Sequence, residues 1–225
     1  GTPPESNANY AWILHILSKL KADKGIAGFL LANGALGDDD TVAIRQKLIG
    51  NDKVEAIVVL PRELFYTTDI SVTLWILNAN KKARVVYRNE EEIHYRDREK
   101  EILFIDMRQM GKPFEKKYVR FTDENIRKVA DTYHNWQREG HTETYTDMPE
   151  FCKSVSMDEE GGIADKGFSL VPSKYIEFVN RDESVDYDTR MKELQSELAD
   201  ILRQEAESRE VVLNVFKSLG YEIKL

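Results

Sequence analysis

The sequence has little of several features that would assign a protein to a familiar class. It contains one cysteine, Cys152, which excludes an intrachain disulfide framework and leads us to expect a reducing compartment, the cytoplasm. No apolar run approaches the roughly 18 residues of a membrane span, and the N-terminus does not resemble a secretion signal. The sequence therefore indicates neither a membrane protein nor a secreted one.

Motifs for common chemistries are also missing. The histidines show no paired spacing and Cys152 has no neighbouring ligand, so we expect no metal site. The chain has no Gly-x-Ser-x-Gly nucleophile motif, no phosphate-binding loop and no Gly-x-Gly-x-x-Gly after a strand. These absences disfavour a serine hydrolase and an α/β protein that binds nucleotides through a phosphate loop.

Charge is unevenly distributed along a chain whose formal net charge is −8. Residues 81–128 contain 14 Lys and Arg against 10 Asp and Glu, whereas residues 139–210 contain 8 against 19. Ordinary solvated surface explains such a fluctuation. The functional alternative is a front half that faces nucleic acid and an acidic rear half. Composition leaves both interpretations open.

The first 60 residues alternate between helical and strand patterns. Apolar spacing predicts a helix over residues 9–24, stopped by Gly25, and a second helix capped by Asp40 or Thr41. A continuous apolar run at residues 27–32 predicts a strand buried on both faces, and residues 54–60, apolar from Ala56 onward, predict another buried strand. This alternation predicts an α/β fold with a largely parallel sheet.

The pattern changes after residue 60. Too few residues separate Leu60 from Ser71 for a crossover helix, so the strand at 71–77 is expected to return antiparallel. Short strands are expected near 85–87 and 102–106, separated by a charged, hairpin-like stretch. Phe121-Thr122-Asp123 opens a helix that runs to Trp136, and residues 138–190 read as irregular.

The C-terminal region has a heptad pattern of apolar residues that ends at Gly220. Glu205 and Ser208 interrupt this seam. A helix with so narrow an apolar stripe either folds back on its own domain or docks against another subunit. The seam consists of Met191, Leu194, Leu198, Ile201, Val212, Val215 and Leu219.

The loop between the strands at 54–60 and 71–77 carries two adjacent aromatic residues, Phe65 and Tyr66. An aromatic face at the rim of a sheet can stack on a nucleobase, at about 1 to 3 kcal/mol per base. The alternative is that one of the two side chains points into the core. Thr2-Pro3-Pro4-Glu5 partly matches the Asn/Asp-Pro-Pro-aromatic motif of amino-methylating enzymes, but it lacks both the amide and the aromatic, so we interpret it as a loop.

Together these segments resemble the modification (M) subunit of type I restriction-modification systems, an adenine-specific DNA methyltransferase. The resemblance follows the family's order over nearly the whole chain. It rests on Gly1-Thr2-Pro3-Pro4, Asn7 to Trp12 and the helix to Lys21, Ile44 to Ile49, Leu60-Pro61-x-x-Leu64-Phe65-Tyr66-x-Thr68-x-Ile70, Leu103 to Asp106, Ile126 to Trp136, and Tyr145 to Lys153.

The resemblance implies the second half of a class I, Rossmann-like S-adenosylmethionine-dependent methyltransferase sheet with a C-terminal helical extension. The cofactor loop and the Asn-Pro-Pro-Phe motif lie upstream in the family, so this C-terminal half is expected to be inactive alone and not to bind S-adenosylmethionine. Three parts are expected. Residues 1–110 form the C-terminal half of the methyltransferase core, residues 111–186 form a helix and an irregular extension, and residues 187–220 form the long C-terminal helix. The implied partners are double-stranded DNA and the specificity (S) and restriction (R) subunits.

By similarity, the loop between the last two strands helps to hold an adenine that has left the base stack. The candidate contacts to the base are Phe65, Tyr66, Thr67, Thr68 and Asn33. The C-terminal helix would dock the specificity subunit through Leu194, Leu198, Ile201, Val212 and Val215. Two functions therefore remain open: part of a DNA methyltransferase, or a docking module without chemistry of its own. A half-sheet would also leave the strand at 27–32 with an open apolar edge, which predicts self-association.

Overall fold

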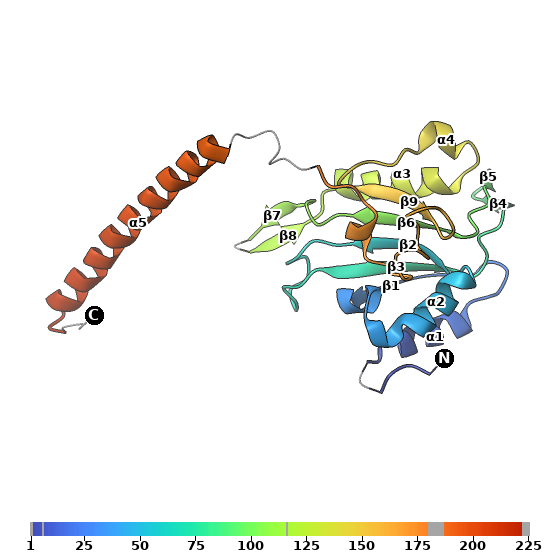
Figure 1. Cartoon of the computed structure of the whole chain (residues 1–225), viewed down its shortest axis with the longest axis horizontal. Coiled ribbons are helices and arrows are strands. Elements are labelled where there is room, and N and C mark those ends of the chain that lie inside the picture. The colour runs from blue at the N-terminus through green and yellow to red at the C-terminus, as the bar shows by residue number, and fades with distance from the viewer. Residues whose placement is uncertain (1, 6, 116, 180–186, 222–225) are drawn as a thin grey trace. The chain divides into compact units, whose positions relative to one another are not determined.

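The computed structural model describes residues 2–5, 7–115, 117–179 and 187–221 (Figure 1). The chain divides into two compact units, residues 1–178 and residues 179–225. Within the described ranges, no helix is both long enough and apolar enough to cross a membrane. The first unit is a mixed α/β domain and the second contains one long helix.

The first unit is built on a five-stranded sheet in the order β1-β3-β2-β6-β9. Only the β2–β6 pair is parallel, and the other three pairs are antiparallel. The prediction of a largely parallel sheet is therefore wrong, because β3 returns directly from β2 and β9 returns beside β6. The antiparallel return of β3 is confirmed. The strands are β1 (Ile26–Ala32), β2 (Val54–Val59), β3 (Val72–Asn78), β6 (Glu101–Asp106) and β9 (Cys152–Ser156).

Helices α1 (Asn9–Lys19) and α2 (Val42–Gly50) cover one face of this sheet (Figure 1). Tyr10 and Ile13 of α1 and Leu48 of α2 pack with Ile57 and Trp75 in a single core cluster. The helix expected at 9–24 ends at Lys19, and the Leu20 N–H closes it on the Leu17 carbonyl. Thr41 occupies the N-cap position of α2, as expected, although its hydroxyl donates to the Asp38 carbonyl and caps no helical N–H.

Helix α3 (Asp123–Gln137) covers the other face, over β2 and β6. Thr122 caps it in a reciprocal capping box with Asn125, which confirms the expected helix start. Trp136 is fully buried against Val58 of β2 and Ile105 of β6. Ile126, an apolar residue near the start of the same helix, is exposed.

Strand β1 differs from its prediction as a strand buried on both faces. Its residues alternate between exposed and half-buried, since Phe29 and Leu31 face the α1–α2 layer while Ile26 and Leu30 lie on the opposite face. The cluster under α3 contains β2, β3 and β6 residues but none from β1. Helix α3 therefore leaves this face of β1 uncovered, and β1 pairs with β3 alone among the described strands.

The predicted strand at 54–60 is confirmed as β2, in which every residue is buried. The irregular region predicted at 138–190 contains a strand that the sequence did not reveal, β9, which pairs with β6. Two hairpins stand apart from the main sheet. They are β4 (Arg84–Arg88) with β5 (Glu91–Tyr95), and β7 (Lys112–Phe114) with β8 (Tyr118–Arg120). The remaining short helices are α4 (His141–Thr144) and the 3-10 turns η1 (Asn33–Leu36), η2 (Asp39–Thr41) and η3 (Pro172–Lys174).

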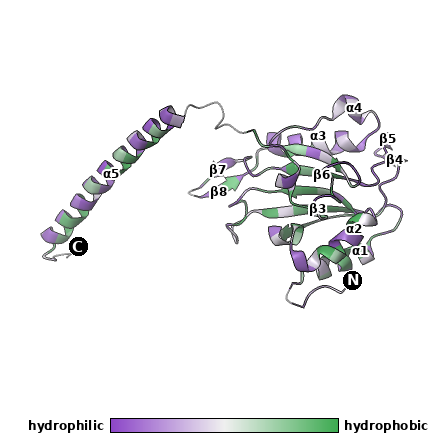
Figure 2. Cartoon of the chain, viewed as in Figure 1, coloured by the Kyte–Doolittle hydropathy of each residue, from purple (hydrophilic) through white to green (hydrophobic). Residues whose placement is uncertain are grey.

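The second unit contains α5 (Tyr187–Ser218), a helix of 32 residues. Figure 2 shows apolar and polar residues mixed along it, in contrast to the apolar strands of the sheet. None of its residues is buried. The seam residues Leu194, Leu198, Ile201, Val212 and Val215 are all exposed. Gly220 follows the helix at a φ of 81°, a conformation in which glycine avoids the Cβ clash of other residues.

Candidate functional site

One edge of the main sheet collects the residues that the sequence suggested for function. Strands β2 and β6 are parallel and end at Val59 and Asp106, while β1 ends and β3 begins at the same edge. In open α/β sheets, ligands bind outside the carboxyl ends of the strands. We call this end of the sheet the carboxyl edge and the opposite end the amino edge.

The loop from Leu60 to Ser71 projects from the carboxyl edge and is closed at its base. The Leu60 N–H donates to the Val72 carbonyl at 2.9 Å, and the Ser71 hydroxyl donates to the Leu60 carbonyl at 2.6 Å. Near its tip, the Thr68 N–H donates to the Phe65 carbonyl at 3.3 Å. These bonds hold the tip as a tight turn.

This turn gives the two adjacent aromatic side chains different environments. Phe65 is half-buried and packs against the cluster beneath α3, which includes Leu60. Tyr66 is 67% exposed, and its ring meets the Tyr118 ring edge-on with the centroids 4.7 Å apart. Of the two, Tyr66 has the face that an added aromatic group could reach.

The remaining predicted residues, Thr67, Thr68 and Asn33, lie at the same edge and differ in their hydrogen-bond partners. Thr67 is exposed, and the Thr68 hydroxyl accepts from the Ile70 N–H at 3.4 Å. The Asn33 side-chain carbonyl accepts from the hydroxyl of the buried Thr73 at 2.6 Å. Because Asn33 itself is exposed, its amide N–H groups remain available as donors.

Sequence reasoning missed Asp106 and Arg108, which end β6 at this edge. The Arg108 guanidinium donates three bonds to the Asp106 carboxylate, at 3.0, 2.9 and 2.6 Å, and these bonds raise the pKa of Arg108. Asp106 is buried, whereas Arg108 is exposed. An acidic residue at the end of a buried apolar strand, two positions before an arginine, was the signal in the sequence that could have identified the pair.

The turn after β1 does not fit a cofactor phosphate or carboxylate. A side chain at Gly34 would approach the Asp38 carboxylate at 3.2 Å, and one at Gly37 would meet Val171 at 3.2 Å. The space beside these glycines is therefore occupied by the chain itself, and an anion would meet Asp38. The Pro4 carbonyl already accepts from the Asn7 N–H at 3.2 Å. In the described ranges, no cluster of three metal-ligating side chains occurs.

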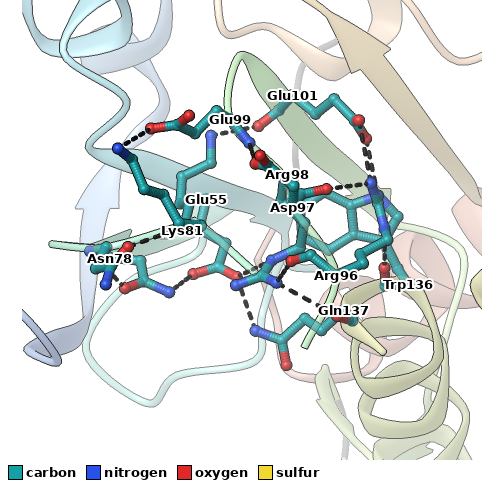
Figure 3. A network of polar contacts seen from close by, with 12 residues as sticks. Glu55, Asn78, Lys81, Arg96, Asp97, Arg98, Glu99, Glu101, Trp136 and Gln137 are labelled. Carbon is teal, nitrogen blue, oxygen red and sulfur yellow. Dashed lines mark hydrogen bonds and ion pairs between the residues drawn. The ribbon is translucent and has the colours of Figure 1, made fainter. Parts of the chain in front are cut away.

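The amino edge contains a buried polar network (Figure 3). Glu55 of β2 lies at a β-bulge against β3 and accepts from Arg98 at 3.1 Å, from Gln137 of α3 at 2.7 Å, and from Asn78. Glu55 and Arg98 are fully buried. Since the members of this network bond to one another across β2, β3 and α3, we interpret it as a structural tie.

Two further ion pairs reinforce the amino edge. The Arg96 guanidinium pairs with Glu101 at 2.8 Å and lies 5.1 Å from the centre of the Trp136 ring. The Lys81 ammonium is buried and donates to Asp52 and to two backbone carbonyls. Burial lowers the pKa of Lys81, and the nearby Asp52 carboxylate opposes that shift.

The fold is shared with proteins of known structure. A TM-score of 0.61 relates it to the methyltransferase subunit of a type I restriction-modification system from Streptococcus thermophilus, at 23% identity over 78% of this chain and 31% of that one. A second solved structure, described as concerning complex assembly and conformational transition of the type I restriction-modification system, matches 95% of this chain and 41% of its own with a TM-score of 0.52 at 19% identity. These likenesses show a methyltransferase-subunit fold.

Residues 1–184 match the family model described as N-6 DNA Methylase, and the chain belongs to this family. It is 35% identical to the HindI methylase subunit, a type I restriction enzyme component of Haemophilus influenzae, over 99% of this chain. The match covers 46% of that relative, so the chain spans less than half of its length. The resemblance to type I modification subunits is thereby confirmed.

Proposed function

We propose that this chain is the part of an adenine-specific DNA methyltransferase subunit that holds the target base. The complete subunit would transfer a methyl group from S-adenosylmethionine to the exocyclic amine of adenine, within a type I system in the cytoplasm. The observation that supports this role most is the carboxyl-edge loop, which anchors Phe65 in the core and leaves Tyr66 exposed.

Each candidate residue has a role that suits its environment. Tyr66 would stack on an extruded adenine, since a base offers a π-face of similar size. Phe65 would fix the loop from below, and Thr67 and Thr68 would position the base or a neighbouring phosphate. The amide N–H groups of Asn33 match the ring-nitrogen acceptors of adenine.

The cofactor would be held by the remainder of the subunit. The turn after β1 is filled by the chain's own atoms, and Thr2-Pro3-Pro4-Glu5 lacks the amide and the aromatic of the family's motif. We propose that β1 gains its missing neighbour from that remainder, which would cover Ile26 and Leu30. On this basis the chain comprises the C-terminal half of the methyltransferase core at 1–110, an extension at 111–186 and a docking helix at 187–220. Without the remainder of the subunit it would be inactive.

The test of the base-holding role is a duplex with 2-aminopurine at a mispaired position, titrated with the wild-type chain and with two variants. Tyr66→Ala is expected to weaken binding roughly 5- to 150-fold, the equivalent of one lost stacking contact. Tyr66→Phe keeps the ring and is the matched control, so it should bind like the wild type. Equal binding by Tyr66→Ala and wild type would contradict the proposed role.

Calorimetric titration with S-adenosylmethionine tests the placement of the cofactor site. We expect no binding by this chain. Binding at micromolar affinity would contradict the half-domain proposal, because it would require a complete cofactor site within these residues.

A second function, subunit docking, is favoured by the exposed apolar seam of α5. We propose that this helix binds the DNA-specificity subunit and that the restriction subunit joins the same assembly. Leu198→Asp with Ile201→Asp should abolish co-purification with the specificity subunit while circular dichroism of the sheet is unchanged. Gln204→Asp, on the same helix but outside the seam, should retain it. Retention by the seam variant would exclude docking through this stripe.

A further inference from the structure

The β7–β8 hairpin presents cations and aromatic rings on a single face. Lys112 pairs with Arg120 and Phe114 pairs with Tyr118, and opposite residues in an antiparallel pair share a face. The Arg120 guanidinium lies 4.9 Å from the centre of the Phe114 ring, which agrees with this register. We call Lys112, Phe114, Tyr118 and Arg120 the basic–aromatic face.

The hairpin that carries this face is joined to the carboxyl-edge loop by three contacts. The Val119 N–H donates to the Glu63 carbonyl at 3.0 Å, and the Lys117 ammonium pairs with Asp69 at 2.9 Å. The third contact is the one between the Tyr118 and Tyr66 rings. The basic–aromatic face is thus continuous with the exposed aromatic of the proposed base site.

The charge of the hairpin contrasts with that of the chain. Residues 111–120 contain four cationic side chains and one carboxylate, a formal surplus of three in a protein of net charge −8. Lys112 and Arg120 are exposed, and neither forms an ion pair with a carboxylate in the part of the chain that the structure describes. Lysine and arginine in this state bind phosphates by displacing condensed counterions.

We infer that the basic–aromatic face binds the DNA phosphate backbone beside the target base, with Lys112 and Arg120 as the phosphate contacts. Phe114 orients the Arg120 guanidinium, and Tyr118 supports Tyr66 from the side. This inference rests on the proposed function, because it assigns the neighbouring phosphates to the same DNA whose base Tyr66 would hold. The contacts would position the duplex without reading its sequence.

The test measures binding of the 225-residue chain to a short fluorescent duplex over a series of salt concentrations. The slope of log affinity against log salt reports the number of phosphate contacts, at about 0.9 per contact. Lys112→Gln with Arg120→Gln should reduce the slope by about 2 and weaken binding to all sequences alike. Lys112→Arg with Arg120→Lys keeps the charge and should preserve the slope.

The matched control removes two charges elsewhere. Lys21 and Lys24 are exposed in the turn that leads into the start of β1, at the amino edge, so Lys21→Gln with Lys24→Gln should leave the slope unchanged. An equal fall for both double variants would overturn the inference in favour of diffuse attraction. An unchanged slope in the hairpin variant also overturns the inference. In that case the exposed hairpin would be available to bind a protein partner instead.

A wild-type chain without salt-dependent DNA binding would likewise overturn the inference. The proposed function is judged separately by the Tyr66 variants in the 2-aminopurine assay. Suppose that Tyr66→Ala weakens binding in that assay and that the hairpin variant has an unchanged salt slope. The hairpin would then lie outside the DNA interface, and the proposed base site would be retained.

Discussion

The two edges of the main sheet use polar and aromatic side chains in opposite ways. At the amino edge, Glu55 and Arg98 are fully buried and bonded to each other and to Gln137. At the carboxyl edge, Tyr66 and Arg120 are exposed, and the protein leaves one ring face and one guanidinium accessible. Buried groups that are bonded to one another stabilise the fold, whereas accessible groups without such partners remain able to bind a ligand.

The largest expected effect comes from breaking the amino-edge network at its centre. Glu55→Ala removes the acceptor of three side chains and leaves the Arg98 cation buried without its partner, which should lower the free energy of unfolding by about 3 to 5 kcal/mol. Urea unfolding followed by tryptophan fluorescence measures this loss. Glu55→Gln retains an acceptor and should cost less. A loss below about 1 kcal/mol for Glu55→Ala would contradict the structural role of the network.

A smaller effect separates the two adjacent aromatics at the carboxyl edge. Phe65→Ala removes half-buried contacts with the core and should cost about 1 to 3 kcal/mol of unfolding free energy. Tyr66→Ala should change it by less than about 0.5 kcal/mol, as expected for an exposed position. Thermal unfolding of both variants gives the comparison directly. Equal destabilisation would show that the turn does not divide the pair into a core residue and a surface residue.

The smallest effect concerns the bond between Thr73 and Asn33. Thr73→Val removes the buried hydroxyl donor and should cost about 1 kcal/mol, the net value of one hydrogen bond. Thr67→Val, at an exposed position of the nearby loop, is the control and should be close to neutral. Guanidinium unfolding resolves the difference. A neutral Thr73→Val would mean that Asn33 is held at the carboxyl edge by its backbone alone.

Elements specified by local signals could be predicted from the sequence. The start of α3 is encoded by the Thr122 cap, and most of β2 by the apolar run that begins at Ala56. Strand β9 could not be predicted, because Cys152–Ser156 is mostly polar and becomes a strand through its pairing with β6. The burial of β1 was overestimated, since whether an apolar strand is covered depends on where α3 packs.

The candidate site, like the fold, could be predicted only where a local pattern encodes it. The pair Phe65-Tyr66 could be read as a rim feature, but the turn bonded between Phe65 and Thr68 decides which ring faces out. The contact between Tyr66 and Tyr118 joins residues 52 positions apart, and no local pattern encodes it. Asp106 and Arg108 were visible in the sequence only as the polar end of a strand.

The strand order of the sheet also constrains how this unit folds. Strand β1 pairs with β3, which lies 40 to 52 residues further along the chain, and it has no other strand neighbour among the described residues. Pairing over such a separation requires a costly loop closure, whereas β2 and β3 are joined by a short loop. We therefore expect β1, and α1 with it, to join a sheet that β2 and β3 have already begun. In hydrogen exchange, the amides of β1 should open well before those of β2, which is enclosed by β3 and β6.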